Sequence, residues 1–175
     1  MFGKFTKNSH QEYSSVKASL LDVPFIFDLM MNGCELGAFS DRYMKGTGGI
    51  RLFWFILRGI FTQSSSARSI ADRSNWYIFS MKRKEIGFMY IETSQATNGT
   101  AVRHVALFGI HPRYRSQGHG TAVLKLFIVA QPTGTSILVH CTKFARAMQH
   151  VLKRLRFIRN PKSGYLLEKY CFVKL

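Results

Sequence analysis

The segment from Val102 to Ile110 carries apolar residues on both of its faces when it is drawn as a strand, and Pro112 ends it. A strand of this kind belongs in the middle of a sheet, with helices packed against both sides. A basic turn with two glycines follows, and Gly120 to Ala130 is predicted to be the next helix. This succession predicts a mixed sheet with helices on both faces.

The rest of the chain supplies further strands and helices. Asp22 as N-cap and Pro24 in the first turn mark the start of one helix, and amphipathic spacing marks another near the C-terminus. Strands are expected where β-branched and aromatic residues lie between turn residues. Helices are predicted over 23–35, 52–60 and 144–155, and strands over 15–19, 76–81, 86–93, 136–141, 157–159 and 165–173. The order β-α-α-β-β-β-α-β-α-β-β describes one sheet of the α/β (α+β) class.

Composition indicates a single globular domain over residues 1–175 with an anionic partner. An apolar fraction of 46% lets folding offset its entropy cost, and no linker divides the chain. Residues 1–13 are expected to be a flexible N-terminal segment. Lysine and arginine number 25 against nine acidic residues, so the formal charge of +16 attracts phosphates, acidic proteins or anionic lipid. Nucleic acid is one such partner.

Cysteine usage and the start of the chain indicate a cytoplasmic protein. The three cysteines are an odd number without close spacing, which favours reduced thiols over disulfides, and no metal site is predicted. Residues 1–12 lack the apolar stretch of a secretory signal. The most apolar segment, Ile50 to Phe61, contains two arginines and is too short to span a bilayer. A core-facing helix is the favoured interpretation of this segment, and a helix lying on a membrane surface is the alternative.

The turn from Arg115 to Gly120, RSQGHG, is the strongest candidate for a binding site. Such a turn, placed between a strand and a helix, brings backbone N–H groups together at the positive end of the helix, where a phosphate is stabilised. Glycines at 118 and 120 allow a ligand to approach closely. From these residues alone, a turn that merely begins a helix remains the alternative.

The motif is more specific in its surroundings. Residues 107–121, LFGIHPRYRSQGHGT, resemble the cofactor motif of the GCN5-related N-acetyltransferase (GNAT) superfamily. Residues 147–157 resemble the second motif of that family, a helix that runs into a Gly-Phe, although Arg156 replaces the glycine. Residues 21–26 resemble its first-helix entry. The resemblance covers nearly the whole chain in the family's order.

The resemblance implies a GNAT fold, in which a single mixed, mostly antiparallel sheet of six to seven strands is splayed at a cofactor cleft. It implies acetyl-coenzyme A as cosubstrate, without a metal. The pantetheine arm is expected to bond to the backbone of Phe108 and Ile110, on either side of Gly109, and Lys153 is expected at the 3′-phosphate. The pyrophosphate is expected to meet Arg115, Ser116, Gln117, Gly118, His119, Gly120 and Thr121.

The general base has two candidates. The resemblance places the family's usual glutamate position at His104, and an imidazole is in general a suitable base near neutral pH. A hydrogen-bonded core histidine is the alternative role for it. Glu92, on the neighbouring predicted strand, is the rival base, with an exposed or turn-stabilising carboxylate as the alternative.

The general acid of many relatives is missing. The tyrosine that protonates the leaving thiolate aligns with Leu152, and the asparagine that contacts the pantetheine aligns with Ala145. Acid catalysis by residue 152 is therefore excluded, and water or another group is expected to take that role. Tyr165 and Cys141 are candidate substitutes of low rank.

Two functions of different classes follow. The first is an acyltransferase, an acetyl-CoA-dependent N-acetyltransferase acting on a primary amine of an unidentified acceptor. The few acidic residues disfavour cationic polyamines and aminoglycosides, which leaves a protein amine, an anionic small molecule or an aminoacyl-tRNA. The second is a catalytically silent GNAT-fold module that binds nucleic acid or an anionic surface through the basic series over 143–162. The oligomeric state is left open, a dimer included.

Overall fold

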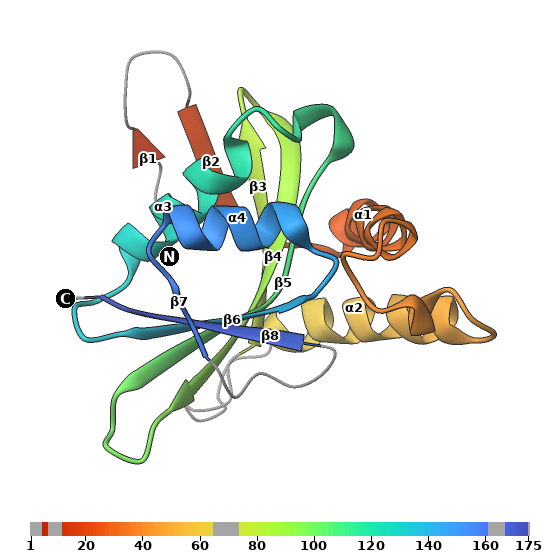
Figure 1. The fold of residues 1–175 in the computed structure, drawn as a ribbon. Coiled ribbons are helices and arrows are strands. Elements are labelled where there is room, and N and C mark those ends of the chain that lie inside the picture. The colour runs from red at the N-terminus through yellow and green to blue at the C-terminus, as the bar shows by residue number, and fades with distance from the viewer. Residues whose placement is uncertain (1–4, 7–11, 65–73, 161–166, 175) are drawn as a thin grey trace.

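The computed structural model describes residues 5–6, 12–64, 74–160 and 167–174, which form one eight-stranded sheet and four α-helices (Figure 1). The strands are β1 (Phe5–Thr6), β2 (Glu12–Lys17), β3 (Ser74–Met81), β4 (Lys84–Gln95), β5 (Ala101–Ile110), β6 (Ser136–Thr142), β7 (Ile158–Arg159) and β8 (Leu167–Val173). The helices are α1 (Val23–Glu35), α2 (Gly48–Ser64), α3 (His119–Ala130) and α4 (Arg146–Arg154).

The sheet opens in its middle. Its order is β1-β2-β3-β4-β5-β6-β8-β7, and each neighbouring pair is antiparallel except β5 and β6. The parallel pairing covers only 102–105 against 136–139, whereas β5 continues to Ile110 and β6 to Thr142. The two strands therefore part beyond Val105, which confirms the predicted splay and the mixed, mostly antiparallel sheet.

Two hydrophobic clusters lie on opposite faces of the sheet. α1 and α2 cover one face, where Trp76 and Phe88 are fully buried between the helices and the strands. α3 and α4 cover the other face and bury Leu124 and Leu152 against it (Figure 1). Burial of apolar side chains on both faces is the main force that holds the layers together. The prediction of helices on both faces is confirmed.

The predicted boundaries hold to different degrees. α1 has the predicted bounds, although the carboxylate of its N-cap Asp22 accepts hydrogen bonds from the N–H and hydroxyl of Ser19 rather than capping α1. β2 begins earlier than predicted, because Tyr13 is buried and pairs with Met81 of β3. The two-residue strands β1 and β7 bring the sheet to eight strands.

The described part of the expected flexible segment 1–13 contributes to β1 and β2. The predicted turn at 161–164 lies outside the described residues.

Candidate functional site

The opening between β5 and β6 leaves one edge of β5 unpaired within the described sheet over 106–110. On the other edge β5 pairs with β4, and the N–H of His111 donates to the carbonyl of Ile86 at 2.8 Å. Backbone groups alternate between the two edges of an antiparallel pair, so those of Phe108 and Ile110 point into the opening. An extended ligand with amide groups can add to this edge as a further strand does.

The turn after β5 has the geometry of an anion-binding loop. Ser116 (φ 60°) and Gly118 (φ 83°) are left-handed, and Gly118 is the N-cap of α3. The first backbone hydrogen bond of the helix runs from the N–H of Ala122 to the carbonyl of Gly118 at 3.0 Å. The N–H groups of 119–121 therefore have no acceptor within the helix. Ser116, Gln117 and Gly118 are exposed. N–H groups in this position stabilise an anion at the positive end of the helix.

The two glycines of the turn have different physical roles. A Cβ on Gly118 would meet no atom within 4 Å, and the positive φ explains the glycine. A Cβ on Gly120 would lie 3.6 Å from Ile110 Cγ1 and 3.7 Å from Phe108 Cε1. Gly120 therefore keeps free the space between the start of α3 and the unpaired part of β5. A ligand that carries a diphosphate followed by an amide-bearing arm matches this juxtaposition.

Arg115 braces the turn. Its Nε donates to the carbonyl of Ile110 at 2.9 Å, and its Nη2 donates to Asn32 Oδ1 of α1 at 2.8 Å. Burial lowers the pKa of this guanidinium, but an arginine keeps its charge. These bonds tie the turn to β5 and α1, and a direct contact of Arg115 with a pyrophosphate stays a prediction. No sequence pattern pointed to Asn32, which lies 83 positions away.

The side chain of His119 points into the protein. It is buried, and its Nδ1 lies 2.8 Å from the hydroxyl of Tyr13. Its backbone N–H remains available in the first turn of α3, beside the half-buried Thr121. Gly109 lies between the two residues of the strand edge, and a Cβ there would come within 2.6 Å of Phe88 Cε1. Glycine at 109 therefore allows the ring of Phe88 to pack closely against β5.

His104 and Glu92 form a pair across β5 and β4. They are directly opposite in register, and His104 Nδ1 lies 3.0 Å from Glu92 Oε2. A carboxylate only accepts hydrogen bonds, so we assign an imidazole hydrogen to Nδ1, which in the neutral ring leaves the lone pair on Nε2. Nε2 is buried and has no hydrogen-bond partner among the described residues. The two rival bases therefore form one unit, in which Glu92 orients His104.

His140 is a third member of this cluster, and the sequence did not single it out. The pairing of β5 with β6 ends one residue before it, and its ring centroid lies 4.4 Å from that of His104. Burial lowers the pKa of His140, and the nearby His104 and Lys169 lower it further. His140 is therefore neutral at neutral pH. Its position on the strand that follows α3 was the available signal, because such a strand lies parallel to β5.

β6 and α4 form the opposite wall of the opening, and the candidate residues on this wall are buried in the hydrophobic core. Leu152 is fully buried and Ala145 is nearly so, both in the cluster beneath α3 and α4. Cys141 is also buried, and this burial, with the charge of Glu168, raises the pKa of its thiol to about 11. The thiol is protonated at neutral pH, but it lies in the apolar core. Tyr165 lies outside the described residues.

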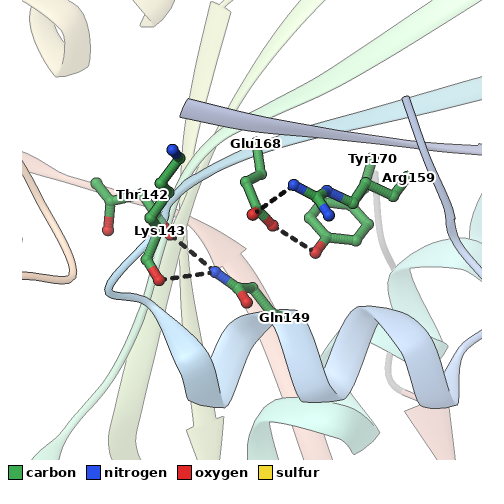
Figure 2. A network of polar contacts seen from close by, with 6 residues as sticks. All are labelled: Thr142, Lys143, Gln149, Arg159, Glu168 and Tyr170. Carbon is green, nitrogen blue, oxygen red and sulfur yellow. Dashed lines mark hydrogen bonds and ion pairs between the residues drawn. The ribbon is translucent and has the colours of Figure 1, made fainter. Parts of the chain in front are cut away.

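A buried carboxylate joins β8 to β7 on this wall (Figure 2). Glu168 accepts a hydrogen bond from the hydroxyl of Tyr170 at 2.8 Å and pairs with Arg159 Nη2 at 2.9 Å. Burial and the carboxylate of Glu168 raise the pKa of Tyr170 to about 12. These contacts satisfy a buried charge and serve the structure of the wall.

α4 turns a basic face outward. On its inner side Gln149 Nε2 donates to the carbonyls of Thr142 and Lys143, each at 3.1 Å, which fixes the helix to the end of β6 (Figure 2). Lys153, the predicted ligand of the 3′-phosphate, is exposed. The exposed basic residues of this region are Lys143, Arg146, Lys153, Arg154, Arg156 and Arg159.

Other classes of site have no support in the described ranges. No three His, Cys, Asp or Glu side chains there are grouped so that they could hold a metal ion. In the same ranges, no helix is both long and apolar enough to pass through a bilayer. Cys34, Cys141 and Cys171 are free thiols.

A splayed β5–β6 pair with a glycine turn that opens α3 defines the GNAT class of fold, and solved structures agree. An acetyltransferase from Thermus thermophilus matches 92% of this chain and 96% of its own at a TM-score of 0.68 and 12% identity. A GNAT-family acetyltransferase from Streptococcus agalactiae matches 95% of this chain and 98% of its own, with a TM-score of 0.67 and 14% identity. RimL, a ribosomal L7/L12 α-N-protein acetyltransferase in complex with coenzyme A, matches 95% of this chain and 96% of its own, with a TM-score of 0.64 and 12% identity.

Identities this low show a shared fold and no more. No family model matches the chain, and no curated protein matches it.

Proposed function

We propose that this protein is an N-acetyltransferase that moves the acetyl group of acetyl-coenzyme A to a primary amine. The observation that carries the proposal is the unpaired edge of β5 next to the glycine turn at the start of α3. The fold is shared with acetyltransferases, one of them solved with coenzyme A. When bound, the coenzyme supplies an acetyl group activated as a thioester.

The chain would hold this ligand mainly through its backbone. The N–H groups of 117–121 suit the pyrophosphate, and the N–H groups of Phe108 and Ile110 suit the amides of the arm. The carbonyl of Phe108 adds an acceptor, whereas that of Ile110 already accepts from Arg115. Lys153 supplies a positive charge for the 3′-phosphate. Arg115 keeps the turn in place through β5 and α1.

His104 is the proposed general base. An amine attacks a thioester only when it is neutral, so a group that accepts its proton speeds the reaction. His104 Nε2 is the free nitrogen of an imidazole held by Glu92, two residues before the part of β5 that loses its partner. Glu92 stabilises the imidazolium that forms, as a carboxylate does beside a catalytic histidine. Leu152 offers no proton, so water protonates the leaving thiolate.

The acceptor is proposed to be anionic or to lie on a protein. A chain with a formal charge of +16 repels small polyamines and attracts acidic proteins and nucleic acids. A protein amine, an amine on an anionic small molecule and an aminoacyl-tRNA all satisfy this condition. The outward basic face of α4 suits a phosphate-bearing acceptor.

The experiment has two stages. Isothermal calorimetry with acetyl-coenzyme A tests binding, and release of the free thiol in the presence of amine panels tests transfer. The panels are acidic peptides with free α-amines, anionic small amines and aminoacyl-tRNA, with spermidine as the cationic comparison. Binding together with amine-dependent thiol release supports the proposal, whereas the absence of coenzyme binding removes it.

A silent GNAT-fold module is the second candidate, and Leu152 is the observation that favours it. A fully buried leucine stands where the family pattern has an acid. In that case the coenzyme binds, no amine releases thiol above the rate in water, and RNA binds with an affinity that falls steeply with salt.

A further inference from the structure

The inner face of α2 is fixed to the sheet. Leu52, Ile56 and Ile60 are buried in the cluster with Trp76. Gly59 permits a close approach, because a Cβ there would lie 2.5 Å from Trp76 Nε1. The prediction of a core-facing helix therefore describes this face of α2.

The outer face of the same helix is also apolar. Ile50, Trp54 and Phe61 are 63%, 61% and 69% exposed. They are spaced at i, i+4 and i+11, which places them on one stripe opposite the buried residues. Phe53, at 39%, lies beside Trp54 with 6.4 Å between the ring centroids and widens this surface. Phe55 instead packs against Trp76 and Tyr90 of the sheet. Figure 1 shows α2 at the outside of the molecule, with its first turns farthest from the sheet. A helix with apolar residues on both faces needs a second partner for the outer one.

The charge on this outer face has one sign. Arg51 and Arg58 are both exposed, and their i, i+7 spacing puts them on the same flank of the stripe. No acidic residue occurs between Gly48 and Ser64. The partner therefore has to offer apolar contact in the middle and negative charge at the side.

A second copy of the chain does not meet this condition. α2 has no acidic residue, so neither a parallel nor an antiparallel pair of α2 helices supplies the negative charge. In a twofold antiparallel pair, each flank also faces the same flank of the other copy, so arginine would face arginine. Nucleic acid offers the charge, but bases stack on rings and leave the aliphatic Ile50 without a role. The boundary of an anionic lipid layer offers both, because aromatic and aliphatic side chains enter the acyl region while arginines reach the headgroups.

We propose that α2 docks in the plane of an anionic phospholipid surface, with Ile50, Trp54 and Phe61 inserted and Arg51 and Arg58 at the phosphates. This binding goes beyond the proposed acetyl transfer and does not depend on it.

The test uses the two tryptophans of the chain. Trp54 is exposed and Trp76 is fully buried, so a change of emission on vesicle binding reports on Trp54. With vesicles of phosphatidylglycerol and phosphatidylcholine, the full-length protein should co-sediment and its emission should shift to the blue. With pure phosphatidylcholine, binding should fall by on the order of tenfold or more, because the electrostatic attraction is lost.

Matched variants locate the surface. Trp54→Ser with Phe61→Ser should weaken vesicle binding by on the order of tenfold or more, whereas Phe144→Ser, at a 74% exposed phenylalanine before α4, should not. Arg51→Gln with Arg58→Gln should weaken it more than Arg146→Gln with Arg154→Gln, which removes the same charge from α4. Gly118→Asp should bind vesicles as wild type does, so failure of the coenzyme proposal is seen separately.

Three results would overturn the proposal. They are equal binding to neutral vesicles, greater sensitivity to the α4 pair than to the α2 pair, and a dimer that Trp54→Ser disrupts without any vesicle binding.

Discussion

The two walls of the opening in the sheet are built on different principles. The β5–α3 wall offers backbone groups and glycines: an unpaired strand edge, a left-handed turn and helical amides that precede pairing. The β6–α4 wall offers packed side chains, with Leu152 and Ala145 in the core and Glu168 bound by its neighbours. Ligand recognition by backbone depends little on side-chain identity. The first wall therefore has the backbone groups on which the proposed coenzyme binding depends, whatever side chain occupies position 152 of the second.

The largest effect on coenzyme binding is expected from a substitution at Gly118, in the β5–α3 wall. Gly118→Asp should weaken coenzyme binding by roughly a hundredfold or more in calorimetry, because it adds a negative charge at the proposed position of the pyrophosphate and strains a left-handed backbone. Gly99→Asp is the matched control, since Gly99 has φ 79° and equally open surroundings in the β4–β5 turn. Equal loss in both variants would attribute the effect to strain alone.

The His104 unit should affect turnover and not binding. His104→Ala should lower kcat by about 10²-fold or more, as loss of a general base does, with coenzyme affinity nearly unchanged. Glu92→Gln should give a smaller loss, because it weakens only the orientation of the imidazole. Steady-state rates across pH 5 to 9 check this. A rate profile that keeps its shape and height in His104→Ala would remove the residue from the mechanism.

A substitution in the network of Glu168, beside the β6–α4 wall, should lower the stability of the fold and leave coenzyme binding intact. Glu168→Leu leaves the buried hydroxyl of Tyr170 without its acceptor, so the free energy of unfolding should fall by about 1–3 kcal/mol. Coenzyme affinity should hold, because the network serves β7 and β8. Urea denaturation and calorimetry measure the two quantities. A loss of affinity without a loss of stability would place Glu168 in the binding site instead.

Alkaline pH probes the same wall. The pKa of Tyr170 is raised to about 12 in the folded protein, whereas an unfolded tyrosine ionises near pH 10. The unfolded state therefore loses its proton first, and stability should decline as pH rises from about 10 to about 12. Tyr170→Phe should flatten this part of the stability curve relative to wild type in urea titrations. An unchanged alkaline decline in the variant would assign it to other groups.

The smallest effect is expected at Lys153. Lys153→Ala should weaken coenzyme binding only a few-fold, since the side chain is exposed and its charge is screened. The loss should shrink when salt is raised. Lys17→Ala, at an exposed lysine on β2, should change affinity less at every salt concentration. Identical behaviour of the two variants would leave no specific role for Lys153.

The sequence predicted those parts of the molecule that local rules control. α1 follows from Pro24 in its first turn and from the left-handed Gly37 just after its end, and the turn before α3 follows from Gly118 and Gly120. Contacts between residues far apart in the sequence could not be predicted from such local patterns. The hydrogen bond from Arg115 to Asn32 depends on how α1 lies against the turn, which no local pattern encodes.

The His104 cluster shows the same limit. Both His104 and Glu92 were candidates, but their pairing depends on the register of β4 and β5, which shifts between Tyr90 and Ile91. A shift of one residue moves a side chain to the other face of a sheet. His140 lies beside His104 because β6 pairs with β5, a contact between strands that are far apart in the sequence.

The most direct test is an amide NMR titration with coenzyme A. If the backbone of the first wall holds the ligand, the N–H signals of 117–121 and of Phe108 and Ile110 should move together and saturate at one dissociation constant. Those of the outward face of α4 should change little apart from Lys153. Shifts confined to the basic residues of α4, with 117–121 unmoved, would contradict the account.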